Sequence, residues 1–108
     1  MKAPDPGERL AGVRALAAQG VYLVTQHAAQ EMVEEAISLE DALDAVASGS
    51  MLEDYPEHRR GACGLIGGRS RSGRPIHVVC TTANPTLVII TVYEPQLPKW
   101  SSPTKRRR

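Results

Sequence analysis

Residues 74–100 read RPIHVVCTTANPTLVIITVYEPQLPKW, and they hold two runs of β-branched residues joined by an Asn-Pro turn. The second run is apolar on both faces apart from Thr91 and Tyr93, which is typical of a central strand covered on both sides. The first run alternates in the manner of a strand with two different faces. If the runs pair as a hairpin, His77 shares one face with Thr91 and Tyr93. Titratable groups on an otherwise apolar sheet are where we first expect function.

The size and composition of the chain favour one domain. Its 108 residues give room for a sizeable core. No apolar run reaches membrane-spanning length, and the N-terminal residues MKAPDP lack the apolar region of a signal peptide. With two cysteines, Cys63 and Cys80, and no secretory signal, we expect reduced thiols and a cytoplasmic protein, although a disulfide between them is geometrically conceivable.

The net charge of +1 conceals a strong asymmetry along the chain. Residues 1–58 carry three basic and eleven acidic residues, whereas residues 59–108 carry ten basic residues and one acidic residue. Two interpretations fit this pattern: a face built for a polyanion, or acidic helices followed by a solvated basic tail.

Three helices are predicted before residue 50. The first spans residues 6–19, because an Asp-Pro pair fits its start and Gly20 fits its end. The third opens at residues 38–41, where Ser-Leu-Glu-Asp resembles a capping box, and ends at Gly49.

The second predicted helix, residues 27–36, has two unlike faces. Helical spacing places toward the core Ala29, Met32, Val33, Ala36 and Ile37. The opposite side carries His27, Glu31, Glu34 and Glu35, with His27 and Glu31 one turn apart.

The predicted strands are short and lie mostly in the second half of the chain. Residues 21–25 form a lone early strand that we expect at an edge of the sheet. Four more strands follow from residue 51 onward, separated by turns and by a basic hairpin loop at residues 68–73. This order predicts an α+β fold: a small antiparallel meander sheet with two or three helices on one face.

The chain is expected to divide into three parts. Residues 1–20 are predicted to be an N-terminal helical extension, and residues 21–100 the main domain. Residues 101–108, which end in Lys-Arg-Arg-Arg, are predicted to be a disordered basic tail.

Several short motifs resemble, in this order, a bacterial family of domains of unknown function. The matching residues are His27, Ala28 and Met32; Ile37, Ser38 and Asp41; Gly49; residues 73–79; and residues 90–100. That family is related to the BrnT and MqsR toxins within the RelE/ParE-like toxin superfamily. The resemblance therefore implies a RelE/BrnT-like fold and a role as the toxin of a type II toxin–antitoxin pair.

The resemblance also implies partners. Many RelE-like relatives cleave messenger RNA, often on the ribosome, whereas ParE-like relatives inhibit gyrase. Members of the family often occur beside a small zinc-ribbon antitoxin. RNA or the ribosome and a cognate antitoxin are the implied partners, with no membrane. Where such proteins usually carry basic residues in the first helix of the domain, this chain has Glu31, Glu34 and Glu35.

Cleavage of RNA by its own 2′-hydroxyl needs a base, an acid and cations that stabilise the charged phosphate. His77 is the first candidate for acid or base, because histidine titrates near neutral pH. Tyr93 is a candidate donor to the leaving group or a stacking surface for a base. His27 stands at a helix start, where the dipole favours a neutral imidazole suited to a base. Each of the three also has a purely structural interpretation, as a packed or hydrogen-bonded side chain.

Arginines in the basic half are candidate phosphate contacts, since guanidinium groups bind phosphate bidentately. The candidates are Arg59, Arg60, Arg69, Arg71 and Arg74. A solvated basic loop is the alternative interpretation. We expect Trp100 to cover the sheet edge rather than to stack on a nucleotide.

The sequence implies no cofactor and no metal site. His77 and Cys80 match a metal-ligand pair only in spacing, because an odd offset in a strand directs them to opposite faces. Two functional hypotheses remain. One is a toxin acting as a metal-independent endoribonuclease on messenger RNA. The alternative is a non-catalytic module of the same fold that binds protein or nucleic acid.

Overall fold

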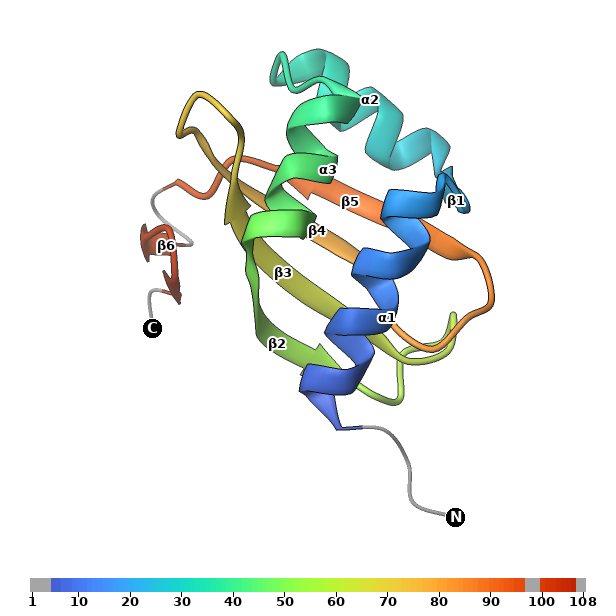
Figure 1. Ribbon diagram of the computed structural model, residues 1–108. Helices are drawn as coiled ribbons and strands as arrows, with labels where there is room; N and C mark the ends of the chain where they lie inside the picture. The colour runs from blue at the N-terminus through green and yellow to red at the C-terminus, as the bar shows by residue number, and fades with distance from the viewer. Residues whose placement is uncertain (1–4, 97–99, 107–108) are drawn as a thin grey trace.

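Three helices cover one face of a five-stranded sheet in the computed structural model, which describes residues 5–96 and 100–106 (Figure 1). The helices are α1 (Pro6–Gln19), α2 (Gln26–Glu34) and α3 (Leu39–Ser48). The sheet consists of β1 (Tyr22–Val24), β2 (Ser50–Tyr55), β3 (Cys63–Arg69), β4 (Pro75–Thr81) and β5 (Leu87–Tyr93). A separate hairpin consists of β6 (Trp100–Ser102) and β7 (Lys105–Arg106). The predicted α+β fold is confirmed.

The strand order is β1-β5-β4-β3-β2. Strands β2 to β5 form the predicted antiparallel meander, and β1 lies at one edge, parallel to β5. Tyr22 pairs with Leu87, which supplies the partner strand that local sequence patterns did not identify. β5 is therefore an interior strand, as expected, but the predicted covering of both faces is wrong. Its buried residues are Leu87, Ile89 and Val92, whereas the residues between them are only half-buried.

The helix ends follow the capping chemistry expected from the sequence. The Asp5 side chain accepts a hydrogen bond from the Glu8 backbone amide at 2.8 Å, and Gly20 ends α1 with a positive φ of 75°. Ser38 and Asp41 make both hydrogen bonds of a capping box at the start of α3. These local signals explain why α1 and α3 begin where the sequence predicts.

The core lies between the helices and the sheet face that carries Ile76 and Val78. Val13 from α1 and Val46 from α3 are buried against it. Close approach of α3 to β3 depends on a glycine, since a Cβ at Gly68 would lie 2.0 Å from the carbonyl oxygen of Ala45. Because α1 contributes to this core, the helix is packed onto the domain that follows it.

The buried face of α2 differs from the prediction. Met32 and Ile37 are buried as predicted, but Ala29, Val33 and Ala36, which were also expected in the core, are exposed, and Val33 is 82% exposed. The reason is that β1 pairs with β5 only as far as Ile89, so the rest of this edge of β5 has no neighbouring strand to pair with its backbone. There the Glu31 carboxylate accepts a hydrogen bond from the Val92 amide at 3.0 Å, and the Glu35 carboxylate accepts one from the Glu94 amide at 2.9 Å. The helix is rotated so that these two glutamates continue the sheet's hydrogen bonding.

The C-terminal segment also differs from the prediction. A disordered tail was expected from residue 101, but residues 100–106 form the β6–β7 hairpin. An isolated two-stranded hairpin is marginal in water, and this one is held by side chains that reach the sheet. Trp100 is only 3% exposed, and Arg106 binds Glu53 of β2. Residues 107–108 of the predicted tail lie outside the described part of the chain.

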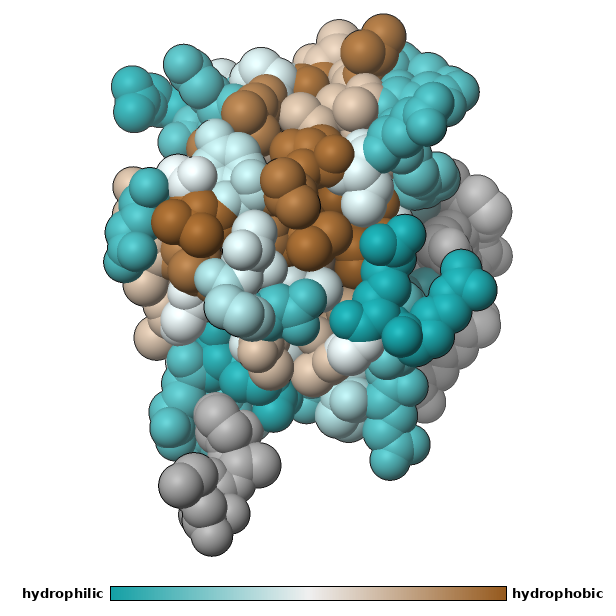
Figure 2. Space-filling view, turned by 90° about the vertical axis from the view of Figure 1, so that its right-hand side faces the viewer, coloured by the Kyte–Doolittle hydropathy of each residue, from teal (hydrophilic) through white to brown (hydrophobic). Residues whose placement is uncertain are grey.

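The edge of the sheet formed by β1 presents apolar side chains. Figure 2 views the side of the molecule where β1 lies and shows apolar residues gathered near its centre. Exposed apolar residues next to or within β1 are Val21 and Leu23, with exposed fractions of 37% and 62%. Among the described residues, no helix has the length and apolar character needed to cross a bilayer.

Candidate functional site

His77 and Tyr93 lie side by side on the sheet face opposite the helices. They are direct partners in the β4–β5 register, and the Nδ1 atom of His77 is 3.2 Å from the Tyr93 hydroxyl oxygen. Their ring centroids are 5.3 Å apart. Thr91, two residues earlier on β5, pairs with Val79 on the same face. The structure therefore brings together the polar trio expected from the alternation of the two strands.

The hydrogen bonds of His77 define its tautomer. Nε2 lies 2.5 Å from the carbonyl oxygen of Pro103, which can only accept, so Nε2 carries the hydrogen. Burial lowers the pKa of His77, against opposing contributions from the Pro103 carbonyl and from the Glu53 charge. A neutral ring protonated at Nε2 leaves the Nδ1 lone pair free to accept the hydrogen bond of the Tyr93 hydroxyl.

Glu53 and Tyr55 extend the polar face from β2. The Tyr55 hydroxyl donates to the Glu53 carboxylate, which also binds the Arg106 guanidinium through both of its oxygens at 2.7 Å. The hydrogen bonds from Arg106 lower the pKa of Glu53. Burial and the Glu53 hydrogen bond raise the pKa of Tyr55 to about 12. Burial also raises the pKa of Tyr93. The phenols thus stay protonated while the carboxylate stays charged.

The β6–β7 hairpin covers this polar face. The Trp100 ring stands edge-on to His77 with centroids 4.4 Å apart, and the Arg106 guanidinium lies over Trp100 at 4.7 Å. Together with the Pro103 carbonyl, these contacts leave His77 only 1% exposed. Trp100 therefore covers the face of the sheet rather than its edge.

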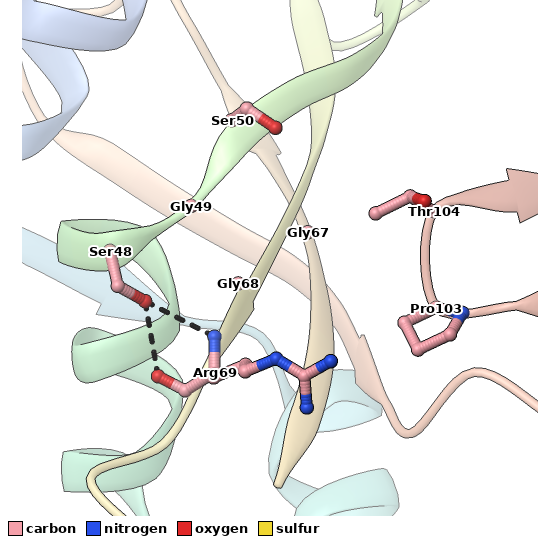
Figure 3. Close-up of a pocket in the computed structure, with 8 residues that line it drawn as sticks. All are labelled: Ser48, Gly49, Ser50, Gly67, Gly68, Arg69, Pro103 and Thr104. Atoms are coloured by element: carbon pink, nitrogen blue, oxygen red, sulfur yellow. Dashed lines mark hydrogen bonds between the residues drawn. The ribbon is translucent and has the colours of Figure 1, made fainter. Parts of the chain in front are cut away.

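A cavity of about 280 Å³ opens beside the covered imidazole (Figure 3). Pro103 and Thr104 of the hairpin stand across it from Gly67 of β3, and Arg69 lies at the end of the same strand. A Cβ at Gly67 would lie 3.3 Å from Nε2 of His77. The same Cβ would lie 2.5 Å from a methyl carbon of Leu52, so a side chain at this position would collide with both Leu52 and His77.

The five predicted arginines do not form one groove. Arg59 and Arg60 precede β3, while Arg69 and Arg71 lie at its other end; seven strand residues span roughly 20 Å. Of these four, Arg69 is near His77, because Gly67, the partner of His77, is two residues from Arg69. Arg71 lies in the turn after β3 and lines a pocket with Glu40, Asp41 and Asp44 of α3.

Arg74 has a structural role instead. Its guanidinium pairs with Glu94 at 2.5 Å and donates to the carbonyl oxygens of Glu35 and Ala36 at 2.6 and 2.9 Å. It thereby fastens the segment after α2 to the end of β5. An arginine with three such contacts has little capacity left for a phosphate.

His27 lies apart from His77. It is in the first turn of α2, with its side chain 66% exposed and its Nε2 atom 3.3 Å from the Glu31 carboxylate. α2 packs on the helix-covered side of the molecule, whereas His77 faces the hairpin on the other side of the sheet. The structure does not bring the two predicted histidines together.

Sequence patterns missed two side chains of the polar face, Glu53 and Arg106. Alternate residues of a strand share a face, so Glu53 and Tyr55 lie on one face of β2, but no local pattern shows that this face adjoins His77. The link runs through β3, whose Leu65 pairs with both Glu53 and Val79. Arg106 was assigned to the tail, and its contact with Glu53 spans 53 residues of sequence.

Neither cysteine belongs to this site. Cys63 and Cys80 are free thiols on opposite faces of adjacent strands, since Cys63 pairs with Thr81 and Cys80 with Gly64. Burial raises the pKa of both thiols, that of Cys80 to about 12. Within the described ranges, no three His, Cys, Asp or Glu side chains are grouped so that they would hold a metal ion.

Comparison with known proteins identifies the family of the domain. The family model described as Domain of unknown function (DUF4258) matches residues 24–94. The chain belongs to this family. The DUF4258 match includes Glu53, Tyr55, His77 and Tyr93, whereas α1 and the β6–β7 hairpin lie outside it. No curated protein and no solved structure matches the chain significantly.

Proposed function

We propose that the chain is the toxin of a type II toxin–antitoxin pair and cleaves messenger RNA without a metal ion, as an endoribonuclease related to the BrnT, MqsR and RelE-like toxins. The observation that carries the proposal is the hydrogen-bonded pair of His77 and Tyr93, 3.2 Å apart beside Glu53 and Arg106. An imidazole, a phenol and a guanidinium are able to supply the base, the acid and the cation that this reaction needs.

The roles follow from the protonation states. His77 is suited to accept the proton of the RNA 2′-hydroxyl at Nδ1 as that oxygen attacks the adjacent phosphorus, because Nε2 carries the ring hydrogen and Nδ1 holds a lone pair. Tyr93 stays protonated near neutral pH because burial raises its pKa, so its phenol can donate a proton to the 5′-oxygen that leaves. Arg69, two residues along β3 from the strand partner of His77, is the cation suited to the phosphate. The products are a 2′,3′-cyclic phosphate and a free 5′-hydroxyl.

The test is inducible expression in bacteria, scored by growth arrest and by cleavage of messenger RNA. We expect wild type to arrest growth and His77→Ala to lose the arrest, with a cleavage rate at least about 100-fold lower, the usual contribution of a general base. His27→Ala is the matched control, because it removes an exposed imidazole on the other side of the sheet. Loss of arrest in His27→Ala, with arrest retained in His77→Ala, would move the site elsewhere.

Purified protein adds a second readout. Cleavage should persist in the presence of a chelator and leave a cyclic phosphate end, and Tyr93→Phe should slow it without unfolding the protein. If the folded wild-type protein leaves both ribosomal and free RNA intact, the ribonuclease proposal is wrong.

The second candidate function is a non-catalytic binding module, and the near-complete burial of His77 favours it. Its partner would be a protein or a nucleic acid that contacts the exposed turn between β3 and β4. In that case His77→Ala should leave nucleic-acid binding unchanged. Charge reversal at Arg69 and Arg71 should weaken it and flatten its salt dependence.

A further inference from the structure

The polar face of the sheet is occupied by a segment of the same chain. The β6–β7 hairpin shares no strand pairing with the main sheet in the described part of the chain. Its contacts are made instead to the functional groups themselves. The Pro103 carbonyl oxygen accepts a hydrogen bond from Nε2 of His77, and the Trp100 ring contacts the same imidazole edge-on. The Arg106 guanidinium donates hydrogen bonds to both carboxylate oxygens of Glu53.

Glu53, His77 and Tyr93 do not need the hairpin in order to be near one another. They come from β2, β4 and β5, whose register is fixed by strand pairing, and all three strands lie within the segment that the DUF4258 model matches. The hairpin lies outside that segment. The hairpin therefore contacts the site as a bound ligand would, and the positions of the site residues do not depend on it.

Resting on the ribonuclease function proposed above, we infer that the hairpin is a built-in inhibitor that must leave before RNA reaches His77. The ion pair that holds it is accessible to solvent, with the Arg106 and Glu53 side chains 39% and 24% exposed. RNA supplies competing phosphates for Arg106. A polyanionic substrate thus releases the hairpin by competing with the Glu53 carboxylate for Arg106.

Glu53→Gln tests this step in the full chain, because it weakens the hold on Arg106 without removing the arginine. The direct readout is the rate at which a histidine-selective reagent, diethyl pyrocarbonate, modifies each histidine, measured by mass spectrometry. Exposed His27 serves as the internal reference. We expect His77 to react much more slowly than His27 in wild type. Glu53→Gln should raise the His77 rate up to about fivefold, the effect of one solvent-exposed ion pair on an equilibrium.

Glu57→Gln is the matched control, since it removes the same charge from the exposed loop between β2 and β3. Trp100→Ala is the second variant and should expose His77 further. Circular dichroism establishes that each variant is folded. A 2′-deoxyoligonucleotide, which supplies phosphates but no 2′-hydroxyl, should raise the His77 rate in wild type. RNA cleavage should increase in Glu53→Gln.

Three outcomes separate the two proposals. Exposure of His77 with faster cleavage supports the inhibitor. Unchanged protection of His77 in folded Glu53→Gln and Trp100→Ala, or with the oligonucleotide, overturns it. Exposure of His77 without RNA cleavage in any variant contradicts the ribonuclease function, while the hairpin remains a displaceable cover of the polar face.

Discussion

Single residues determine how closely the layers of this molecule approach. At Gly68 a Cβ would lie 2.0 Å from the Ala45 carbonyl oxygen, so Gly68→Ala must push α3 away from β3. We expect it to lower the free energy of unfolding by about 3 kcal/mol, in the upper range for overpacking. Urea unfolding monitored by circular dichroism measures the change.

Gly12 is the matched control for that substitution. It lies within α1, and a Cβ there would meet no atom within 4 Å. Gly12→Ala should stabilise the protein by about 1 kcal/mol, since alanine is the better helix former. Equal effects of the two substitutions would contradict the packing argument for Gly68.

The positions of several residues could be predicted from their neighbours in the sequence. The capping box at Ser38 and Asp41 and the pairing of His77 with Tyr93 depend on neighbours in sequence or on one tight hairpin, so short patterns contain the necessary information. Glu53 beside His77 was not predictable in the same way, because its position depends on the pairing of three strands. Arg106 required knowledge of how the last segment folds back.

At the scale of elements, α2 shows why helical spacing alone gave the wrong buried face. Apolar periodicity favoured Val33, but the free edge of β5 requires hydrogen-bond acceptors, and Glu31 and Glu35 supply them. Leaving two backbone amides without hydrogen-bond acceptors would cost more free energy than burying one valine side chain would gain. Glu31 and Glu35, two of the three acidic residues that depart from the basic pattern of the resembling toxins, thereby have a structural function.

This explanation predicts unequal effects for neighbouring glutamates. Glu31→Ala leaves the Val92 amide without its acceptor and should destabilise the protein by about 1–3 kcal/mol. Glu34→Ala should change stability by less than about 0.5 kcal/mol, because Glu34 is exposed and, among the described residues, its side chain accepts one hydrogen bond, from Gln30 on its own helix. Glu31→Gln keeps a carbonyl acceptor and should recover most of the loss. Chemical denaturation of the three variants decides the matter, and equal losses in Glu31→Ala and Glu34→Ala would contradict the explanation.

For the whole molecule, the buried imidazole couples stability to pH. Burial lowers the pKa of His77 below its ordinary 6.5, so the unfolded chain binds this proton at a higher pH than the folded chain. The free energy of unfolding should therefore decrease as the pH falls below about 6.5. The slope from this group is at most about 1.4 kcal/mol per pH unit. The lowered pKa values of Glu53 and Glu94 act in a separate window below 4.5.

Urea unfolding at pH 7.5, 6.5 and 5.5 measures this dependence, and His77→Gln is the comparison. The variant lacks the titrating group, so its stability should vary less over the same range. Parallel pH profiles for wild type and His77→Gln would show that His77 does not carry the effect.

The pairing of β1 with β5 has a consequence for synthesis of the protein. Tyr22 leaves the ribosome early, but its partner Leu87 is added 65 residues later. Until then the apolar side of the first three helices has no complete sheet to cover it, and the nascent chain exposes that surface. The domain can close only after β5 has been synthesised, so a ribosome that stalls before β5 holds a chain in which this apolar surface is still exposed.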